Sequence, residues 1–389
     1  MEVYLSDDSI VKLVEFIIAK AISAGASDIH LEHDSDGLRV RYRIDGVLHD
    51  QTKINKQLML QVAGRIKVLA KLDLSERRIP QDGKIRYMHE EEYVDLRVST
   101  FPGAYGEKFV IRILDQRQLN VVLNNLGMDL ALLKKVQDLI ARPHGFILVT
   151  GPTGSGKTTT LYAMLKELHA PDKNIITLED PVEYLISGIT QGQIYPKAGF
   201  SFAKGMRSLL RQDPDIAMVG EIRDSESARI AIEAALTGHI VLSTLHTNDA
   251  AGAVARLMDM GIEPFLINAS LSGVIAQRLV RKLCDHCKVV EQPSIHDLVL
   301  MQELNIECKQ LFKSVGCDQC KHLGYSGRVG IFELLELTED LRNLIIKHPK
   351  LSDIYQRAIA DGMTPLRQDA VQKLVAGITS LEEVLRVIR

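Results

Sequence analysis

The chain of 389 residues has few aromatic residues and no excess of charge of either sign. It has no Trp, its aromatic residues make up 5%, and 47 Lys and Arg stand against 50 Asp and Glu for a net charge of −3. Nucleic-acid binding depends on a basic surface or on aromatic stacking platforms, so we expect no nucleic-acid partner.

Long hydrophobic runs are also missing. Every stretch of about 18 residues contains an Asp, Glu, Lys or Arg, which excludes a membrane-spanning helix. Glu2 follows Met1 directly and no apolar signal-peptide core comes after it, so we expect a cytoplasmic protein. The length predicts two or three domains.

Of the five cysteines, four form two C-x-x-C pairs, Cys284 with Cys287 and Cys317 with Cys320. This usage fits a reducing compartment, where thiols bind metal more readily than they form structural disulfides. Four thiolates suit tetrahedral Zn²⁺, although the spacer between the pairs is longer than a zinc ribbon usually has. A redox pair or unrelated buried thiols are the alternatives. Cys308 stands alone, and we expect it to be a packing residue.

A phosphate-binding loop (P-loop) is the most informative motif. The apolar run 146–149 predicts a strand, Gly-Pro-Thr-Gly-Ser-Gly-Lys-Thr follows at 151–158, and residues 159–168 suit a helix. The glycines let backbone N–H groups wrap a polyphosphate, Lys157 reaches the β- and γ-phosphates, and Thr158 offers its hydroxyl to Mg²⁺. The bare pattern also occurs by chance, but its strand and helix favour binding of ATP. The expected nucleotide-binding residues are Gly151, Pro152, Thr153, Gly154, Ser155, Gly156, Lys157, Thr158 and Thr159.

Two further predicted strands end in acidic residues. The strand at 174–178 is followed by Glu179, and the strand at 216–219 is followed by Gly220 and Glu221. Carboxyl ends of parallel strands meet at one edge of a sheet, so both glutamates should converge on the P-loop. We assign Glu221 to the magnesium shell, through water, and Glu179 to polarising the attacking water; the two roles could be exchanged.

Other polar residues near these strand ends are less specific. Glu183 and Asp224 fit catalysis and surface ion pairs about equally well. His239 and His246 flank a predicted strand at 240–244. A structural role fits His239 as well as a functional one, whereas the imidazole of His246 lies on the expected ligand side and can hydrogen-bond a γ-phosphate.

The pattern along the chain predicts an α/β protein in two main parts. Residues 1–114 combine strands with helices, and polar residues at 115–126 indicate a linker. Residues 127–282 alternate short apolar strands with helices, as in a parallel sheet covered on both faces. A four-cysteine zinc subdomain at 283–330 and a helical region at 331–389 follow, and Ser380 with Glu383, or Thr379 with Glu382, can form a capping box. The expected strands are 29–32, 38–44, 84–87, 94–99, 108–114, 146–149, 174–178, 216–219 and 240–244, and a helix is expected at 57–72.

Across nearly its whole length the chain resembles the secretion ATPases of type II secretion and type IV pilus assembly. Beside the P-loop it carries that family's Asp box at 178–183, its Walker B motif at 211–224 and its His box at 238–248. The N-terminal segments 25–32, 43–47 and 80–83 match as well. The Walker B motif is unusual in having Gly220 where an aspartate often precedes the glutamate.

The resemblance implies a hexameric ATPase on the cytoplasmic face of the inner membrane. It implies a PAS-like N-terminal domain and a RecA-like C-terminal domain, whose motion drives an inner-membrane platform protein that adds pilin-like subunits to a pilus or pseudopilus. The family's catalytic arginines map onto Arg97 and Arg112 in the N-terminal domain and onto Arg207 and Arg211 before the Walker B motif. The four-cysteine element is similar to that of assembly or secretion motors, and retraction motors lack it.

Members of this family usually carry a further N-terminal domain that docks on a membrane-anchored partner. Residue 1 here lies almost at the start of the PAS-like domain, so either the chain is a piece of a longer protein or its docking differs. Contact with acidic phospholipid is a further expectation. Two other functions stay open at this point: a RecA-like nucleic-acid translocase, and a regulatory nucleotide-binding module that hydrolyses little. The motor motifs do not distinguish secretion, pilus growth and DNA uptake.

Overall fold

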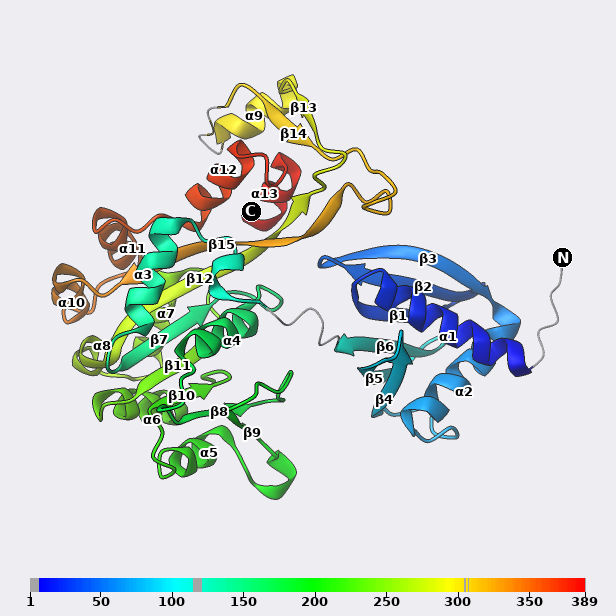
Figure 1. Ribbon diagram of the computed structural model, residues 1–389, viewed down its shortest axis with the longest axis horizontal. Coiled ribbons are helices and arrows are strands. Elements are labelled where there is room, and N and C mark those ends of the chain that lie inside the picture. The colour runs from blue at the N-terminus through cyan, green and yellow to red at the C-terminus, as the bar shows by residue number, and fades with distance from the viewer. Residues whose placement is uncertain (1–6, 115–120, 304–305, 307, 389) are drawn as a thin grey trace. The chain divides into compact units, whose positions relative to one another are not determined.

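The computed structural model describes residues 7–114, 121–303, 306 and 308–388. The chain divides into two compact units, Met1–Asn120 and Val121–Arg389 (Figure 1). Residues 115–120 of the expected linker lie outside the described residues, and its remainder contains the short 3-10 helix η3 (Leu123–Asn125). None of the described helices is long and apolar enough to cross a membrane.

The first unit is an antiparallel six-stranded sheet with two helices, in the strand order β3-β2-β1-β6-β5-β4. Successive side chains of a strand point to opposite faces, and in β5 the alternate residues Val94, Leu96 and Val98 are buried. The hydroxyl of Tyr42 on β2 donates to Ile17 O of α1 at 2.7 Å, which fixes this helix on the sheet. The elements are α1 (Asp7–Ser23), β1 (Ala26–Asp34), β2 (Gly37–Ile44), β3 (Val47–Asn55), η1 (Lys56–Leu58), α2 (Met59–Ala70), β4 (Asp82–His89), β5 (Glu92–Gly103) and β6 (Gly106–Leu114).

The second unit is built on a seven-stranded sheet in the order β15-β12-β7-β11-β10-β8-β9. The strands from β12 to β9 are parallel to their neighbours, and β15 is antiparallel to β12. Phe146 and Leu148 of β7 pack into one hydrophobic core, and Ile147 and Val149 pack into a second core. Because both faces are covered, the strand reads as a continuous apolar run. The strands are β7 (Gly145–Thr150), β8 (Ile175–Glu179), β9 (Thr190–Gln193), β10 (Ile216–Val219), β11 (Ile240–Leu245), β12 (Leu271–Leu283) and β15 (Tyr325–Glu336).

Helices cover both faces of this sheet, with one hydrophobic core on each face. One core contains residues of α3 and α4, and the other contains residues of α5 to α8 and of the C-terminal helices. The bounds are α3 (Leu130–Ile140), α4 (Lys157–Leu168), η4 (Pro196–Ala198), α5 (Phe202–Leu209), α6 (Ser225–Leu236), α7 (Ala250–Asp259), α8 (Pro264–Ser270), α10 (Glu339–Ile345), α11 (Leu351–Ala360), α12 (Leu366–Val375) and α13 (Leu381–Ile388).

Strand β12 continues into an arm that contains β13 (Val289–Glu291), α9 (Ile295–Glu303) and β14 (Leu311–Lys313) (Figure 1). The base of this arm is tied to the C-terminal helices. Arg281 of β12 and Arg386 of α13 both pair with the fully buried carboxylate of Glu383, and Leu283 N donates to Ile378 O at 2.9 Å.

The α/β fold class predicted from the sequence is confirmed, and each expected strand has a counterpart in the structure. The sequence analysis missed β3, β9, β12, β13, β14 and β15. Strands β3 and β9 lie at sheet edges, where few apolar residues are needed and alternation is weak. Strand β15 corrects the expectation of a purely parallel sheet, because it adds an antiparallel edge to the parallel strands.

Candidate nucleotide-binding site and four-cysteine centre

The P-loop connects β7 to α4, as the sequence predicts. Gly151, Gly154 and Gly156 have φ values of 145°, 79° and 88°, which side-chain-bearing residues rarely adopt. A Cβ atom on Gly151 would lie only 2.4 Å from Gln277 O of β12. Helix α4 begins at Lys157, so its N-terminal N–H groups and partial positive charge are available to an anion in the loop.

Lys157 is buried against its own loop. Its Nζ donates to Gly151 O at 2.8 Å and to Pro152 O at 3.1 Å. Burial lowers the pKa of Lys157, and the charge of Glu221 opposes this change. Ser155 Oγ is a buried atom with no hydrogen-bond partner among the described residues. An ammonium group and an unpaired hydroxyl beside glycines with positive φ fit the phosphates of ATP. Of the other expected residues, Pro152, Thr153, Gly154 and Thr158 are exposed and Thr159 is half-buried.

Glu221 joins the Walker B strand to the His box. It follows β10, and its carboxylate accepts from Arg223 Nε at 2.8 Å and lies 3.2 Å from His246 Nε2. Burial alone would raise the pKa of Glu221, but Arg223 and His246 together lower it. The carboxylate of Glu221 therefore stays ionised, and its negative charge acts on Lys157. An ionised carboxylate can accept hydrogen bonds from water bound to magnesium.

Glu179 is held in a different way, at the end of β8. The hydroxyls of Tyr162 and Thr177 donate to its two carboxylate oxygens, and Gln191 Nε2 donates to Oε1 at 3.2 Å. Burial raises the pKa of Glu179 against the effect of these donors. Both oxygens are thus engaged by the protein, and the expected role of Glu179 toward the attacking water stays a prediction.

The remaining polar residues of these strand ends have structural contacts. Asp224 caps α6 by accepting from Ser227 N at 2.8 Å. His239 Nδ1 lies 2.8 Å from Ala234 O at the end of the same helix. These contacts account for Asp224 and His239 without a catalytic role.

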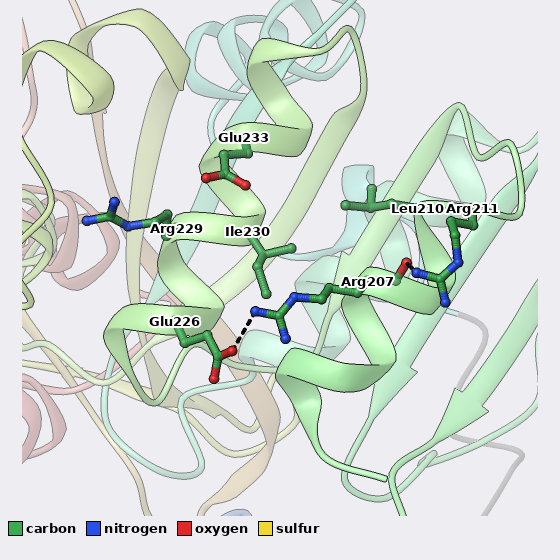
Figure 2. A pocket seen from close by; sticks show the side chains of 7 residues that line it. All are labelled: Arg207, Leu210, Arg211, Glu226, Arg229, Ile230 and Glu233. Carbon is green, nitrogen blue, oxygen red and sulfur yellow. Dashed lines mark hydrogen bonds and ion pairs between the residues drawn. The ribbon is translucent and has the colours of Figure 1, made fainter.

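Arg207 and Arg211 line a pocket of about 320 Å³ between α5 and α6. Figure 2 shows Arg207 reaching toward Glu226, with 2.6 Å between Nη2 and Oε1. Arg211 instead donates to Arg207 O at 2.7 Å and to Ser208 Oγ at 3.2 Å. Glu226 lies in the first turn of α6, which follows the Walker B strand, so Arg207 is tied to that motif through the helix. A contact of either arginine with the nucleotide stays a prediction.

Arg97 and Arg112 lie directly opposite each other on β5 and β6 of the first unit. Arg112 is also opposite Asp28 of β1, which in turn is opposite Arg43 of β2. Asp28 pairs with Arg112 at 3.2 Å and with Arg43 at 3.7 Å. Register therefore places these four charged residues in one row across the sheet, on the face opposite the buried apolar residues, and one carboxylate orients two of the three guanidinium groups.

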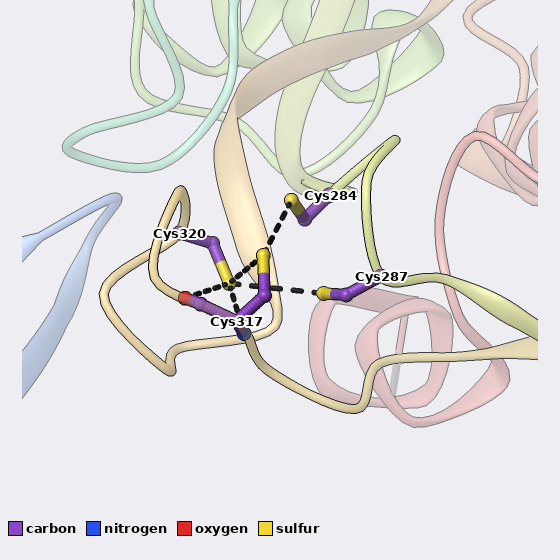
Figure 3. Close-up of side chains that lie close together, drawn as sticks. All are labelled: Cys284, Cys287, Cys317 and Cys320. Atoms are coloured by element: carbon purple, nitrogen blue, oxygen red, sulfur yellow. Dashed lines mark hydrogen bonds between the residues drawn. The ribbon is translucent and has the colours of Figure 1, made fainter.

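The four paired cysteines form one cluster (Figure 3). Cys284 and Cys287 follow β12, whereas Cys317 and Cys320 lie between β14 and β15. The Sγ atoms are 3.9 Å apart for Cys284 and Cys317, and 3.8 Å apart both for Cys287 and Cys320 and for Cys317 and Cys320. All four are free of disulfides. Cys308, by contrast, packs beside the second unit's core.

These distances fit zinc. A tetrahedron with Zn–S bonds of about 2.3 Å has S···S edges of about 3.8 Å. The N–H groups of Cys317 and Gly324 each point at Cys320 Sγ at 3.2 Å. Burial would raise the pKa of Cys320, but these N–H groups and the neighbouring thiols lower it to about 6. The four sulfur atoms therefore lie in the geometry that zinc requires, and four thiolate ligands would leave no open coordination position.

Several residues of the site were missed by the sequence analysis. Tyr162 on α4 and Gln191 on β9 hold Glu179, Arg223 pairs with Glu221, and Gln277 on β12 contacts the P-loop. Arg223 lies two positions after Glu221 and was visible in the Walker B segment. Tyr162, Gln191 and Gln277 come from other parts of the sequence and carry no local signal.

A P-loop on a parallel sheet, with an ionised glutamate near its lysine, defines a P-loop nucleotide-binding protein. Comparison with known proteins narrows this class. The family model "Type II/IV secretion system protein" matches residues 4–386, and the chain belongs to this family. It is 49% identical to the type II secretion system ATPase E of Vibrio cholerae over 98% of the chain and 76% of that protein. It is 46% identical to the type IV pilus assembly ATPase PilB of Thermus thermophilus over 98% of the chain and 43% of that protein.

A solved structure agrees with the sequence matches. The crystal structure of the pilus retraction motor PilT with bound ADP superposes with a TM-score of 0.63 at 27% identity, covering 96% of each chain. The ATPase DotB of Legionella pneumophila has the same fold, with a TM-score of 0.68 at 22% identity over 97% of this chain and 95% of that one.

Proposed function

We propose that the chain is an ATP-hydrolysing motor of type II secretion or type IV pilus assembly. The observation that carries this proposal is the arrangement of Lys157 in the P-loop, Glu221 whose charge acts on Lys157, and His246 in contact with Glu221. The relatives named above are secretion and pilus ATPases, which favours this function over a nucleic-acid translocase.

The chain's own residues have distinct roles in hydrolysis. Lys157 and the first N–H groups of α4 would hold the β- and γ-phosphates, and Thr158 and Glu221 would hold magnesium, Glu221 through water. When bound, Mg²⁺ neutralises charge on the phosphates. Glu221 has an ionised carboxylate whose charge acts on Lys157, and its side chain is less buried than that of Glu179, which supports Glu221 for the magnesium shell. Glu179 then acts on the attacking water only if its bonds to Tyr162 and Gln191 open.

Four arginines could link hydrolysis to movement of the protein. Guanidinium groups stabilise the charge of a transferring phosphoryl group. Arg97 and Arg112 belong to the first unit, so their approach to a nucleotide on the second unit would couple hydrolysis to closure of the two units. Arg207 would act from α5 and Arg211 from the turn that follows it, next to α6.

The assembly and location of the motor follow from the family. We expect a homo-hexamer, peripheral on the cytoplasmic face of the inner membrane, that acts on a platform protein and docks on a membrane-anchored partner. Zinc at the four cysteines has a structural role, since four thiolates exclude a catalytic water.

An ATPase assay tests the proposal. The parent protein should hydrolyse ATP, and Lys157→Ala should abolish binding or turnover. Single-stranded DNA should leave the rate unchanged, whereas vesicles of acidic phospholipid should leave it unchanged or raise it. No hydrolysis by the parent in any condition would point to a regulatory module, and stimulation by DNA alone would point to a translocase.

A further inference from the structure

Strand β12 lies directly beside the P-loop strand. Its register with β7 pairs Ala276 with Thr150, the last residue before the loop. The next residue, Gln277, is 1% exposed, and its Nε2 donates to Ser155 O inside the loop at 2.7 Å. A residue far away in sequence thus supplies a hydrogen bond to the loop's own backbone.

Gln277 also limits the space under the loop. Its main-chain oxygen would lie 2.4 Å from a Cβ at Gly151, and its Nε2 would lie 3.2 Å from a Cβ at Gly156. Gly151 and Gly156, the first and last glycines of the loop, therefore both pack on Gln277. The path of the loop backbone thus depends on where Gln277 lies.

Few other hydrogen-bonding groups lie near the side chain of Gln277 among the described residues. Gln277 Oε1 and Ser155 Oγ are both buried atoms that have no hydrogen-bond partner among the described residues. Within the described part of the chain, the bond from Nε2 to Ser155 O is therefore the one polar contact of the Gln277 side chain, and its loss would leave a loop carbonyl without this donor.

We propose that Gln277 is a positioning residue that holds the P-loop in its phosphate-binding curvature and thereby sets the affinity for ATP. It does not touch the reacting atoms. This inference rests on the proposed nucleotide binding at the P-loop. The class of ligand it affects is a nucleoside triphosphate or diphosphate, because the loop wraps the phosphates and not the base.

Two substitutions separate the donor from the shape of the side chain. Gln277→Leu removes the hydrogen bond, and Gln277→Glu keeps the shape but replaces the donor with an acceptor and adds negative charge near the phosphates. For Gln277→Leu we expect the Kd for ADP and the KM for ATP to rise about tenfold, which corresponds to about 1.4 kcal/mol. Gln277→Glu should raise both constants further, and kcat should fall by much less than KM rises.

The chain offers a matched control in Asn268 of α8. Its side-chain amide is also buried, donates to a main-chain carbonyl, Arg342 O, at 2.7 Å, and has an unpartnered oxygen among the described residues. Asn268→Leu should lower the unfolding midpoint about as much as Gln277→Leu and leave Kd for ADP unchanged.

The outcomes distinguish this inference from the proposed function. Parental hydrolysis that is lost in Lys157→Ala supports the function independently of Gln277. Given that result, parental Kd and KM in both Gln277 variants would overturn the inference. A Kd that rises equally in Asn268→Leu would also overturn it, because general destabilisation would then explain the effect.

Discussion

His246 Nε2 lies 3.2 Å from Glu221 Oε2, and this contact joins the ends of β10 and β11. The imidazole is half-exposed while the carboxylate is largely buried. His246 is therefore placed between solvent, or a ligand, and the glutamate whose charge acts on Lys157. A change in the charge of His246 or of Glu221 would therefore alter the electrostatic environment of the other residue.

His246→Ala should lower turnover while ATP binding is kept. Without the imidazole, Glu221 loses one of the two side chains that orient it, and we expect kcat to fall about tenfold or more. Steady-state kinetics together with a nucleotide-binding titration measure the two effects separately. His239→Ala serves as the control, because His239 bonds the end of α6. Equal kinetics in both variants would remove His246 from the mechanism.

Glu221→Gln should bind ATP and hardly hydrolyse it. The amide keeps the size of the side chain but loses the negative charge, so the P-loop is preserved and the magnesium shell is weakened. Single-turnover measurements with bound ATP test this. Turnover equal to that of the parent would assign the essential carboxylate to Glu179.

Zinc should be present at one ion per chain. Cys317→Ser should lose the metal and lower stability more than activity per folded molecule, because the site is structural. Cys308→Ser should keep it, since Cys308 lies outside the cluster. Elemental analysis of purified protein provides the measurement, and metal-free protein with cysteines paired as disulfides would contradict the assignment.

The arginines should separate into catalytic and structural ones. Alanine at Arg97, Arg112, Arg207 or Arg211 should lower turnover by about 10³-fold or more where the guanidinium reaches the phosphoryl group. An arginine whose guanidinium makes only an ion pair, for example the pair of Arg207 with Glu226, should instead leave turnover near the parental value. Parental turnover in all four variants, in conditions where the parent assembles, would contradict coupling by closure.

The free energy of unfolding should decrease at acid pH because the carboxylate of Glu383 becomes protonated. Burial alone would raise the pKa of this carboxylate, but Arg386 and Arg281 lower it to about 2. Since the folded-state pKa is below the unfolded value, the stabilisation is complete above about pH 4.5 and is lost as the pH falls toward 2; its size is about 3 kcal/mol.

Urea unfolding between pH 3 and 7 measures this contribution. Glu383→Gln should reduce stability at neutral pH and flatten the acid slope. Its exposed neighbour provides the control, and Glu382→Gln should leave the slope as in the parent. An unchanged slope in Glu383→Gln would assign the acid sensitivity to other carboxylates.

How far the sequence predicts the structure depends on whether a residue's partner is nearby in the chain. The P-loop, the strand ends at Glu179 and Glu221, and the cysteine pairs were predicted because each signal lies within a few residues. Glu383 shows the opposite case. Its spacing from Ser380 suggests a capping box, and Glu383 N does donate to Ser380 Oγ at 3.3 Å, but its side chain binds Arg281 instead. Only the tertiary packing of α13 on β12 determines that choice.

The same limit explains the missed residues around the P-loop. Gln277 contacts Ser155 because β12 inserts next to β7 in the sheet, and nothing within the sequence around residue 277 predicts a strand in that position. Its polar residues interrupt the apolar run that signals a buried strand.

The part of β12 from Gln277 to the last residue of the strand, Leu283, has a fixed length because it connects two sites. Gln277 contacts the nucleotide loop, and Cys284 follows the strand's last residue, Leu283, in the thiol cluster. Inserting or deleting one residue between them would turn every later side chain to the opposite face. Either the bond of Gln277 to the P-loop or the place of Cys284 in the thiol cluster would then be lost. This segment should therefore tolerate substitutions far better than changes in length.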